Sequence, residues 1–508
     1  MISRIENSLF WRFAIGIGLS VLSAILIVLA FPPYTVWPLV FIGWVPMLIA
    51  QYRLLPAKWS ALAPALAIGL WLQGYLGPVF RPIGTFMVWL PLIVAGLTLL
   101  TDRGLQAFHQ KTAYRWFVPM GVLNWAGTEM IRLFIPIAGT WAFIAYPLYR
   151  QTWLIQPVSL FGIIGMGMVV MWINYGLALG CLRWLETKTT PSAEESRLSP
   201  RLVKQWLIAT AGMAAVWLGL SLALYLQPLS TPSLQVAAIQ PSRSLIMSAL
   251  AGEEGVVTRL HQRMLEQSRE AANQGARIIV WPEGVMPWDP LVEDRLGLRS
   301  LTAETNAYLA SGYVIVTEQG LRNEATVLSP SGEFLGVFGK DHPVVFAGET
   351  SLTRGTYPVY STELGRVATI ICYDLDYTDT ARKMAAQGAQ LIAVPSNDWS
   401  TIADKHYTHL VFRAVENRVA MVKADGGWDS AIIDPYGHIK ALAAFPQGGE
   451  ATLVGEVQIG HGKGSLYTRL GDWTGWLGLI GMIFFAVAGG WLEKRSESSL
   501  PKGFLSTR

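Results

Sequence analysis

Long apolar segments constrain the fold of this chain more than any other feature. A helix needs about 20 largely apolar residues to cross a hydrocarbon core of roughly 30 Å. Seven such segments precede residue 228, and an eighth follows a long, more polar middle region. They lie near residues 11–31, 36–51, 59–80, 84–101, 115–136, 157–182, 206–226 and 473–492. The sequence therefore predicts a polytopic α-helical membrane domain with about eight spans.

Composition and charge agree with a membrane protein. Of all residues, 52% are hydrophobic and 15% are charged, which is too apolar for an ordinary soluble enzyme. The first segment is long, lacks a small-residue cleavage site and runs into further spans, so we expect a span and not a cleaved signal peptide. The formal net charge is only +4, and the Lys and Arg residues are spread over short loops, which argues against a nucleic-acid partner.

The distribution of basic residues predicts the orientation of the spans, because Lys and Arg are enriched in cytoplasmic loops. With a cytoplasmic N-terminus, Arg53, Lys58, Arg103 and Lys111 fall inside. Seven spans then place the middle region outside, and the eighth span returns the C-terminal tail to the cytoplasm. The expected parts are a membrane domain at 1–227, an extracytoplasmic domain at 228–469, and an eighth span with a cytoplasmic tail at 470–508.

The middle region alternates short apolar runs, typical of strands, with amphipathic segments, typical of helices. Strands are predicted at 234–240, 276–281, 313–318, 325–329, 336–340, 367–372, 391–395, 419–423, 430–434 and 453–457. Helices are predicted at 256–274, 379–387 and 407–417. This alternation, with added hairpins, predicts an α/β or α+β sandwich with helices outside.

Three reactive side chains each follow an apolar run of the middle region. Glu283 comes after Ala276–Pro282, Lys340 after Phe334–Gly339, and Cys372 after Val367–Ile371. An active-site thiol reacts as the thiolate, so it needs a base or a nearby cation. A carboxylate can take the thiol proton, and an amine can supply positive charge for the thiolate and for an oxyanion. The three residues therefore form a candidate catalytic centre.

Each of the three also has an ordinary structural interpretation. A cysteine that follows Ile370 and Ile371 is by default a buried small hydrophobe, and Glu283 and Lys340 are in isolation a loop carboxylate and a solvated turn residue. The presence of all three reactive types favours the catalytic interpretation.

Neither a disulfide framework nor a metal centre is expected. The two cysteines, Cys181 and Cys372, lie in different expected domains, so no disulfide framework or thiolate cluster is available. His406 and His409 lie three residues apart on an expected helix, but no third ligand is apparent from the sequence. We expect no metal and no cofactor.

These motifs resemble the Glu-Lys-Cys signature of the nitrilase (carbon–nitrogen hydrolase) superfamily. The segments that carry the resemblance are Trp281-Pro-Glu-Gly, Lys340 shortly before Glu349, Ile371-Cys-Tyr-Asp, and Pro395-Ser-Asn-Asp-Trp. The resemblance implies an αββα sandwich. It also implies the following roles: general base for Glu283, nucleophile for Cys372, and oxyanion stabilisation by Lys340 and the backbone N–H of Tyr373.

Within this superfamily, seven leading spans and one trailing span resemble the apolipoprotein N-acyltransferase family. Further motifs that carry this resemblance are Phe31-Pro-Pro-Tyr34, Glu129-Met-Ile-Arg132 and Asn174. The resemblance implies a monomeric, multi-pass protein of the bacterial inner membrane with its catalytic domain on the periplasmic side. It implies a phospholipid as acyl donor and a lipoprotein as acceptor, joined through a thioester on Cys372.

Several residues are candidates for supporting roles. Glu349 is expected to orient Lys340, Asp374 stands where the family commonly has Glu, and Asn323 is a candidate for a hydrogen bond to the site or for a turn cap. Glu129 and Arg132 lie at membrane depth, where charge is costly unless it is paired or faces a cavity. They are functional candidates or, equally, a structural ion pair between helices.

Two other functions stay open at the level of the sequence. The interval from Lys340 to Cys372 is short for the N-acyltransferase family, and its motif at His342–Glu349 has a displaced proline and one added residue. A second hypothesis is therefore a membrane-anchored nitrilase-type amidase or acyltransferase that acts on another amide, amine or lipid. A third is a catalytically silent relative that serves as a scaffold or in transport, which the retained reactive residues disfavour.

Overall fold

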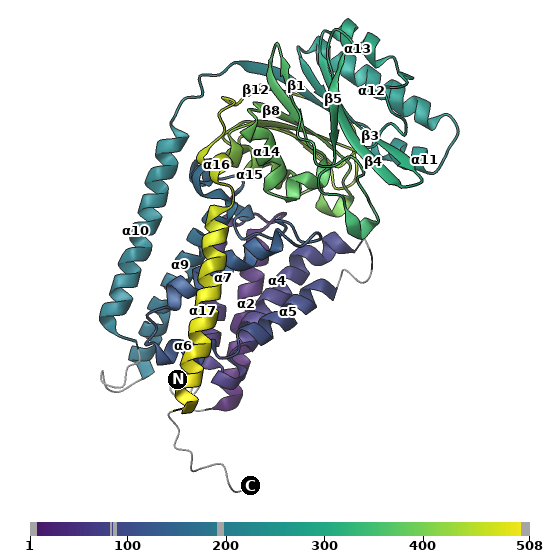
Figure 1. The fold of residues 1–508 in the computed structure, drawn as a ribbon. Helices are drawn as coiled ribbons and strands as arrows, with labels where there is room; N and C mark the ends of the chain where they lie inside the picture. Colours follow the sequence, from purple (N-terminus) through teal and green to yellow (C-terminus); the bar gives the residue numbers. More distant parts are fainter. Residues whose placement is uncertain (1–7, 82–83, 85–88, 190–197, 499–508) are drawn as a thin grey trace.

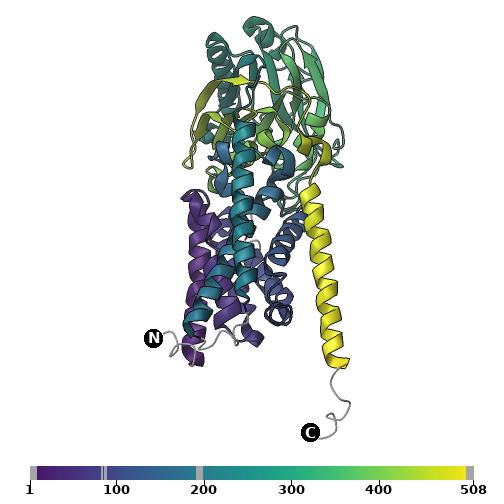
Figure 2. The ribbon, with the colours of Figure 1, turned by 90° about the vertical axis from the view of Figure 1, so that its left-hand side faces the viewer.

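The computed structural model describes residues 8–81, 84, 89–189 and 198–498. Helices and a β-sandwich form two stacked bodies (Figure 1). The chain enters the sandwich from helix α10 (Pro200–Tyr225) and leaves it through helix α17 (Trp473–Ser498), and both run along the helical body (Figures 1 and 2). The expected order of a helical region, a sandwich and a last helix is therefore present, while residues 499–508 of the expected tail lie outside the described residues.

Five helices are long and apolar enough to cross a membrane, judged by length and composition. These segments are Leu9–Ala30, Ala57–Val79, Val158–Lys188, Pro200–Tyr225 and Trp473–Gly490. The helices that carry them are α2 (Leu9–Ala30), α4 (Leu62–Phe80), α9 (Val158–Thr189), α10 and α17. Apolar side chains on α10, such as Ile208 and Val216, are exposed. That exposure suits a helix whose outer face meets lipid.

The other three expected spans are shorter or broken. Residues 36–51 do not form one helix, because the segment divides into η1 (Trp37–Phe41), α3 (Val45–Ile49) and the start of η2 (Ala50–Leu54). Pro38 and Pro46 each stand in the first turn of a new element, where the missing N–H is tolerated.

The two remaining candidates form short helices in the described chain. Helix α5 covers Leu90–Thr101, and residues 85–88 of its expected span lie outside the described residues. Helix α7 covers Phe117–Arg132 and ends before a loop at 133–145. The helices α6 (Leu105–Lys111) and α8 (Thr152–Ile155) are shorter still. The structure therefore supports five apolar spans, and the count of eight stays a prediction.

The sandwich consists of two six-stranded sheets. One sheet has the order β12-β1-β2-β3-β4-β5, and the other has the order β11-β10-β9-β8-β7-β6. In each sheet the central strands, β1-β2-β3 and β7-β8-β9, are parallel and the outer pairs are antiparallel. The strands are β1 (Ser233–Gln240), β2 (Ile278–Val280), β3 (Tyr308–Thr317), β4 (Gly320–Leu328), β5 (Phe334–Gly339), β6 (Val359–Thr362), β7 (Gly365–Thr369), β8 (Leu391–Ser396), β9 (Ala420–Asp425), β10 (Asp429–Ile433), β11 (Ile439–Ala444) and β12 (Ala451–Gln458).

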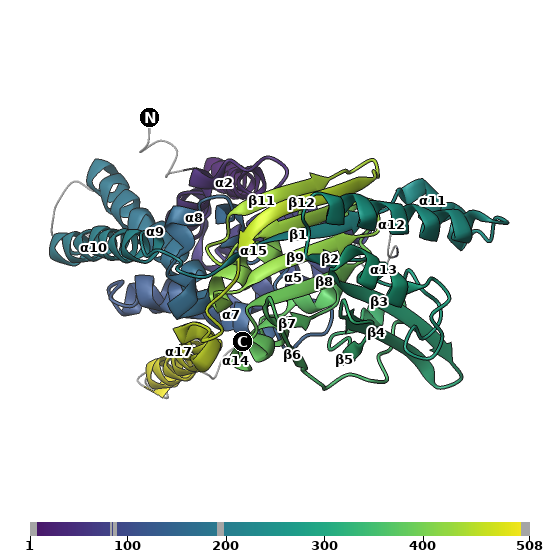
Figure 3. The ribbon, with the colours of Figure 1, turned by 90° about the horizontal axis from the view of Figure 1, so that it is seen from above.

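Helices cover the outer faces of the two sheets, which gives the expected layered αββα arrangement (Figures 1 and 3). On the first sheet lie α11 (Arg243–Leu250), α12 (Val256–Asn273) and α13 (Leu298–Thr305). On the second lie α14 (Asp379–Ala386) and α15 (Tyr407–Asn417). Apolar side chains from both sheets, including Val236, Ile278 and Val422, form a buried core between them.

All ten predicted strands and all three predicted helices of this region are confirmed, within a few residues at their ends. The strands β6 and β11 were not predicted. β6 has only four residues and alternates poorly, and β11 is rich in alanine, which is depleted in strands.

Helix α15 joins the sandwich to the helical body. Glu416 accepts a hydrogen bond of 2.9 Å from the backbone N–H of Ile163 in α9, and it pairs with Arg413 at 3.0 Å. Trp473 at the start of α17 donates to the carbonyl of Leu160 at 2.9 Å. One buried hydrophobic cluster runs from the membrane helices into the second sheet and α15. The two bodies are therefore packed as one unit, which holds the second sheet and α15 against the helices.

Candidate active site

Strand ends bring the three predicted reactive residues to one end of the sandwich. Glu283 follows β2, Lys340 follows β5, and Cys372 follows β7. Their exposed fractions are 8%, 1% and 6%, so all three are buried. Gly312 on β3 lets the sheet approach closely here, since a Cβ at this position would stand 2.8 Å from the Cα of Glu283. The close backbone approach explains a glycine in the middle of a strand.

Lys340 is held between two carboxylates. Its Nζ donates to Oε1 of Glu283 at 2.9 Å and to Oε1 and Oε2 of Glu349 at 3.0 and 2.9 Å. Asn323 donates through Nδ2 to Glu283 at 2.6 Å and also to Glu349. Burial lowers the pKa of Lys340, but the charges of Glu283, Cys372 and Glu349 outweigh burial and hold that pKa well above its usual value. The amine is therefore a permanent, fixed cation.

Cys372 stands on a strained turn at the end of its strand. Its φ is +44°, in the left-handed region that non-glycine residues rarely adopt, and it opens a short 3₁₀ helix, η8 (Cys372–Asp376). Strain of this kind is found at active sites, where the surrounding structure enforces it. Burial and the charge of Glu283 raise the pKa of the Cys372 thiol, while Lys340 lowers it. The resting thiol is therefore protonated and must lose its proton to a base before it reacts.

Asp374 braces the turn of Cys372 against the segment that follows Lys340. Its Oδ1 accepts hydrogen bonds from the backbone N–H groups of Asp341 and His342 at 3.1 and 2.8 Å, and its Oδ2 accepts one from Ile371 at 2.9 Å. Burial raises the pKa of Asp374 to about 7, against the opposing charge of His342. The Asp374 carboxyl group therefore fixes the backbone on both sides of the site. Tyr373, the next residue toward the N-terminus, contacts the helical body by donating to the carbonyl of Pro136 at 3.3 Å.

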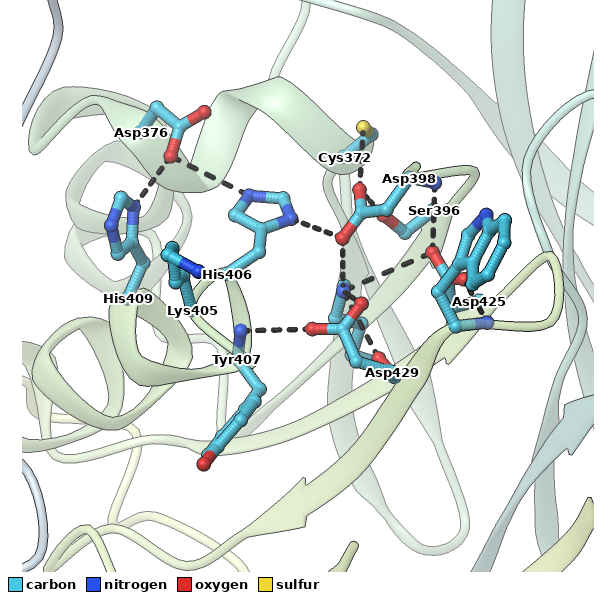
Figure 4. A network of polar contacts seen from close by, with 12 residues as sticks. Cys372, Asp376, Ser396, Asp398, Lys405, His406, Tyr407, His409, Asp425 and Asp429 are labelled. Atoms are coloured by element: carbon cyan, nitrogen blue, oxygen red, sulfur yellow. Dashed lines mark hydrogen bonds and ion pairs between the residues drawn. The ribbon is translucent and has the colours of Figure 1, made fainter. Parts of the chain in front are cut away.

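A second polar cluster lies beside Cys372 (Figure 4). The Cys372 thiol donates to Oδ1 of Asp398 at 3.6 Å, and Oδ2 of Asp398 receives hydrogen bonds from Lys423 and His406, both at 2.7 Å. Lys423 also contacts Oδ1 of Asp429 at 2.6 Å. These side chains are fully or almost fully buried. The cluster therefore places the Asp398 carboxylate beside the sulfur, with Lys423 and His406 offsetting its negative charge.

Sequence reasoning named His406 and His409, and the segment Pro395-Ser-Asn-Asp-Trp that contains Asp398, but missed the rest of this cluster. The missed members are Asp376, Lys423, Asp425 and Asp429. Asp376 is the third group beside His406 and His409 that the sequence did not reveal. The position of Asp376, four residues after Cys372, could have suggested a role near the site. Its contact with His406, thirty residues later in the chain, could not be predicted from local sequence.

Three groups of side chains could offer ligand atoms to a metal ion. They are Asp376 with His406 and His409, Asp341 with His342 and Asp379, and Asp398 with Asp425 and Asp429, each with its ligand atoms within 4.8 Å of one another. In every group a histidine or lysine nitrogen already contacts a carboxylate. We therefore interpret these groups as hydrogen-bonded charge clusters.

Glu129 and Arg132 hold a loop of the helical body. Glu129 accepts hydrogen bonds through Oε1 from Trp125 and from the backbone N–H of Ile144, both at 3.0 Å, and Arg132 donates to the carbonyl of Trp141. No ion pair joins these two residues in the part of the chain that the structure describes. Both side chains fix the loop that touches the turn of Cys372, and the two interpretations made from the sequence, functional residues or a structural ion pair, stay predictions.

Comparisons with known proteins find relatives for both bodies. The profile described as "Carbon-nitrogen hydrolase" matches residues 235–463, and the profile described as "Apolipoprotein N-acyltransferase N-terminal domain" matches residues 23–176. An apolipoprotein N-acyltransferase of Geobacter metallireducens is 27% identical over 92% of this chain and 94% of its own length. One from Thermosynechococcus vestitus is 24% identical over 94% of this chain and 95% of its own length. An omega-amidase of Homo sapiens is 28% identical over 34% of this chain and 75% of its own length.

Proposed function

Because the chain belongs to the apolipoprotein N-acyltransferase family of the nitrilase superfamily, we propose that it transfers an acyl chain from a membrane phospholipid to the α-amine of a lipoprotein's diacylglyceryl-cysteine. One observation supports this most directly. A buried carboxylate, amine and thiol stand at the end of the sandwich that is packed onto apolar helices. The site is thus placed where a lipid acyl chain can be kept out of water.

In the first half-reaction, Cys372 attacks the ester carbonyl of the phospholipid. Glu283 accepts the thiol proton, a carbon–sulfur bond forms, and Lys340 with the backbone N–H of Tyr373 stabilises the oxyanion. The ester carbon–oxygen bond then breaks, and Glu283 returns the proton to the departing lysophospholipid. The raised pKa of the Cys372 thiol is consistent with a thiol that needs a base, and the raised pKa of Lys340 with a cation that stabilises the oxyanion.

In the second half-reaction, the α-amine of the lipoprotein attacks the thioester. A carbon–nitrogen bond forms and the carbon–sulfur bond breaks, while Glu283 accepts the proton that the amine loses. Transfer of that proton to the sulfur regenerates the thiol. Glu349 and Asn323 keep Lys340 and Glu283 in place through both steps by the contacts described above. Two half-reactions that share one site give ping-pong kinetics.

The finer topology is part of the same proposal. The number of eight spans rests on the apolar segments, and the cytoplasmic N-terminus with a catalytic domain on the outer, periplasmic side of the bacterial inner membrane rests on the loop charges and the family. The positions of α10 and α17 support this topology, since both helices connect to the sandwich at the same end of the helical body. We also propose that the enzyme acts as a monomer.

The amidase hypothesis is less well supported than N-acyl transfer. The N-acyltransferases match over 92% and 94% of this chain, whereas the omega-amidase matches over 34%. Only the former relatives therefore account for both the helices and the sandwich.

Trapping of the acyl-enzyme tests the proposed function. Purified protein incubated with phospholipid alone should gain the mass of one acyl chain, and a diacylglyceryl lipopeptide added afterwards should remove it. The Cys372→Ala protein should gain no mass, whereas Cys181→Ala, which changes the other cysteine, should behave as the unchanged protein. A protein that acylates the lipopeptide without ever carrying the adduct would contradict the covalent mechanism.

A further inference from the structure

A chain of polar contacts runs from Cys372 to Asp376 (Figure 4). It begins at Cys372, whose thiol donates to Oδ1 of Asp398 at 3.6 Å. The other carboxylate oxygen of Asp398 contacts Nδ1 of His406 at 2.7 Å. Nε2 of His406 faces Oδ1 of Asp376 at 3.5 Å. One histidine thus bridges two carboxylates, and one of these carboxylates touches the sulfur.

The surroundings of His406 favour its cationic form. Both ring nitrogens face carboxylate oxygens: Nδ1 makes the hydrogen bond to Asp398, and Nε2 lies at the longer ion-pair distance of 3.5 Å from Asp376. Two carboxylates this close favour the charged form of the ring. Burial lowers the pKa of His406, but the charges of Asp398 and Asp376 outweigh burial and raise that pKa to about 10, with Lys423 opposing them. His409, which contacts the same oxygen of Asp376 at 2.5 Å, has its pKa lowered by burial to about 4 and is neutral.

The loop at 133–145 closes this cluster from the side of the helical body. Thr140 donates to the carbonyl of Asp376 through its backbone N–H at 2.8 Å and through Oγ1 at 3.0 Å. The ring of Trp141 stacks on His406, and that of Tyr146, just after the loop, stacks on His409. Gly139 has a φ of +47°, and a Cβ there would stand 2.6 Å from the Asp376 carbonyl, so the fit requires glycine.

The cluster offsets the negative charge of the carboxylate beside the Cys372 sulfur. Asp398 is one of the groups that raise the pKa of the Cys372 thiol. Two cations, Lys423 and His406, bind the far oxygen of that carboxylate and offset its charge. Without His406 the carboxylate beside the sulfur would be less neutralised and would keep only the side-chain contacts of Lys423 and Ser396 at 2.7 and 2.9 Å, besides the thiol. The thiolate of Cys372 would then be harder to form, and the position of its sulfur would be less well fixed.

Resting on the proposed role of Cys372 as nucleophile, we propose that His406 is a positioning residue that fixes Asp398 beside the sulfur, and that the loop at 133–145 holds His406 in place through Asp376. The helical body would then contribute to catalysis by supporting the nucleophile as well as by anchoring the enzyme. Neither His406 nor Asp376 needs to touch the substrate for this role.

The experiment compares His406→Gln and Asp376→Asn with the unchanged residues, all in a Cys181→Ala background so that Cys372 is the single thiol. The rate of acyl-enzyme formation is measured against phospholipid concentration, and the rate of Cys372 alkylation by iodoacetamide is measured against pH. We expect the maximal acylation rate to fall by about 10- to 100-fold with little change in the half-saturating phospholipid concentration. We expect the alkylation profile of His406→Gln to move to higher pH by about one unit.

A matched control is His438→Gln. His438 makes a similar contact, Nδ1 to Oδ2 of Asp434 at 2.7 Å, but belongs to a different cluster. This variant should leave both measurements unchanged. Asp376→Glu should recover part of the rate that Asp376→Asn loses, because it restores the carboxylate.

The outcomes separate the two proposals. An unshifted alkylation profile together with an acylation rate within about twofold of the control would overturn the role of His406. Absence of any acyl adduct on the enzyme with His406 intact would instead overturn the proposed function. The alkylation profile would still decide whether His406 acts on the thiol, because that measurement needs no phospholipid.

Discussion

Two buried lysines flank the nucleophile, and each is held between two carboxylates. Lys340 lies between Glu283 and Glu349, whose side chains keep 9% and 13% of their surface exposed. Lys423 lies between Asp398 and Asp429, and all three side chains are fully buried. Under the proposed function, the partly open cluster meets the substrate and exchanges a proton, and the sealed cluster supports its neighbours. The two clusters share residue types and differ in their exposure to solvent.

The largest expected effect is on the open cluster. We predict that Lys340→Met lowers the rate of acyl-enzyme formation by about 10²- to 10³-fold, because the oxyanion loses its fixed cation. The melting temperature should fall less than in the matched variant of the sealed cluster, Lys423→Met, since water can reach Glu283 and Glu349. The check is the acylation rate by intact mass together with thermal unfolding of both variants. A rate within tenfold of the unchanged enzyme would contradict the role of Lys340.

The sealed cluster should respond with a loss of stability. We predict that Lys423→Met lowers the free energy of unfolding by about 3–5 kcal/mol, because Asp398 and Asp429 are left as buried charges without a cation. Denaturant unfolding in detergent micelles measures this loss, with Lys340→Met as the control. Equal stability of the two variants would remove the distinction drawn between the clusters.

The sealed cluster should also make stability depend on pH. The folded protein holds the His406 proton up to a pH of about 10, whereas an ordinary histidine loses it near 6.5. The stabilisation is therefore complete below pH 6.5 and is lost as the pH rises toward 10. Thermal unfolding over this range should show a decline that is weaker in His406→Gln. Parallel curves for both proteins would show that His406 is not charged in the folded state.

The smallest expected effect concerns the contact between the bodies. Thr140→Val removes the hydroxyl bond to the Asp376 carbonyl but keeps the backbone bond. We predict a loss of about 0.5–1.5 kcal/mol in unfolding free energy and a modest fall in acylation rate. Thr452→Val, which removes an exposed hydroxyl contact to Glu270, is the control. A larger effect of the control would show that the loop does not brace the nucleophile.

Local pattern in the sequence was enough to predict five apolar helices, ten strands and the three reactive residues. Each of these features depends on a short stretch of chain: an apolar run, an alternation of apolar and polar residues, or a reactive residue at the end of a strand. The strand β11 and the division of residues 36–54 into three elements escaped prediction because alanines and prolines weaken those patterns, and β6 escaped because it has only four residues.

Only the tertiary structure decided how these elements meet. Asp376, His406 and Lys423 lie on η8, at the start of α15 and on β9, and the order of the second sheet brings them together behind Cys372. Glu129 and Arg132 were visible as charges in an apolar helix, yet their partners lie on a loop that local sequence does not place. Hydrophobic periodicity is a local property, whereas the pairing of buried charges depends on contacts between distant segments. The sequence alone therefore determined which reactive groups the chain carries, and the packing of the sandwich on the helices decided which of them keep some exposure and which are fully buried.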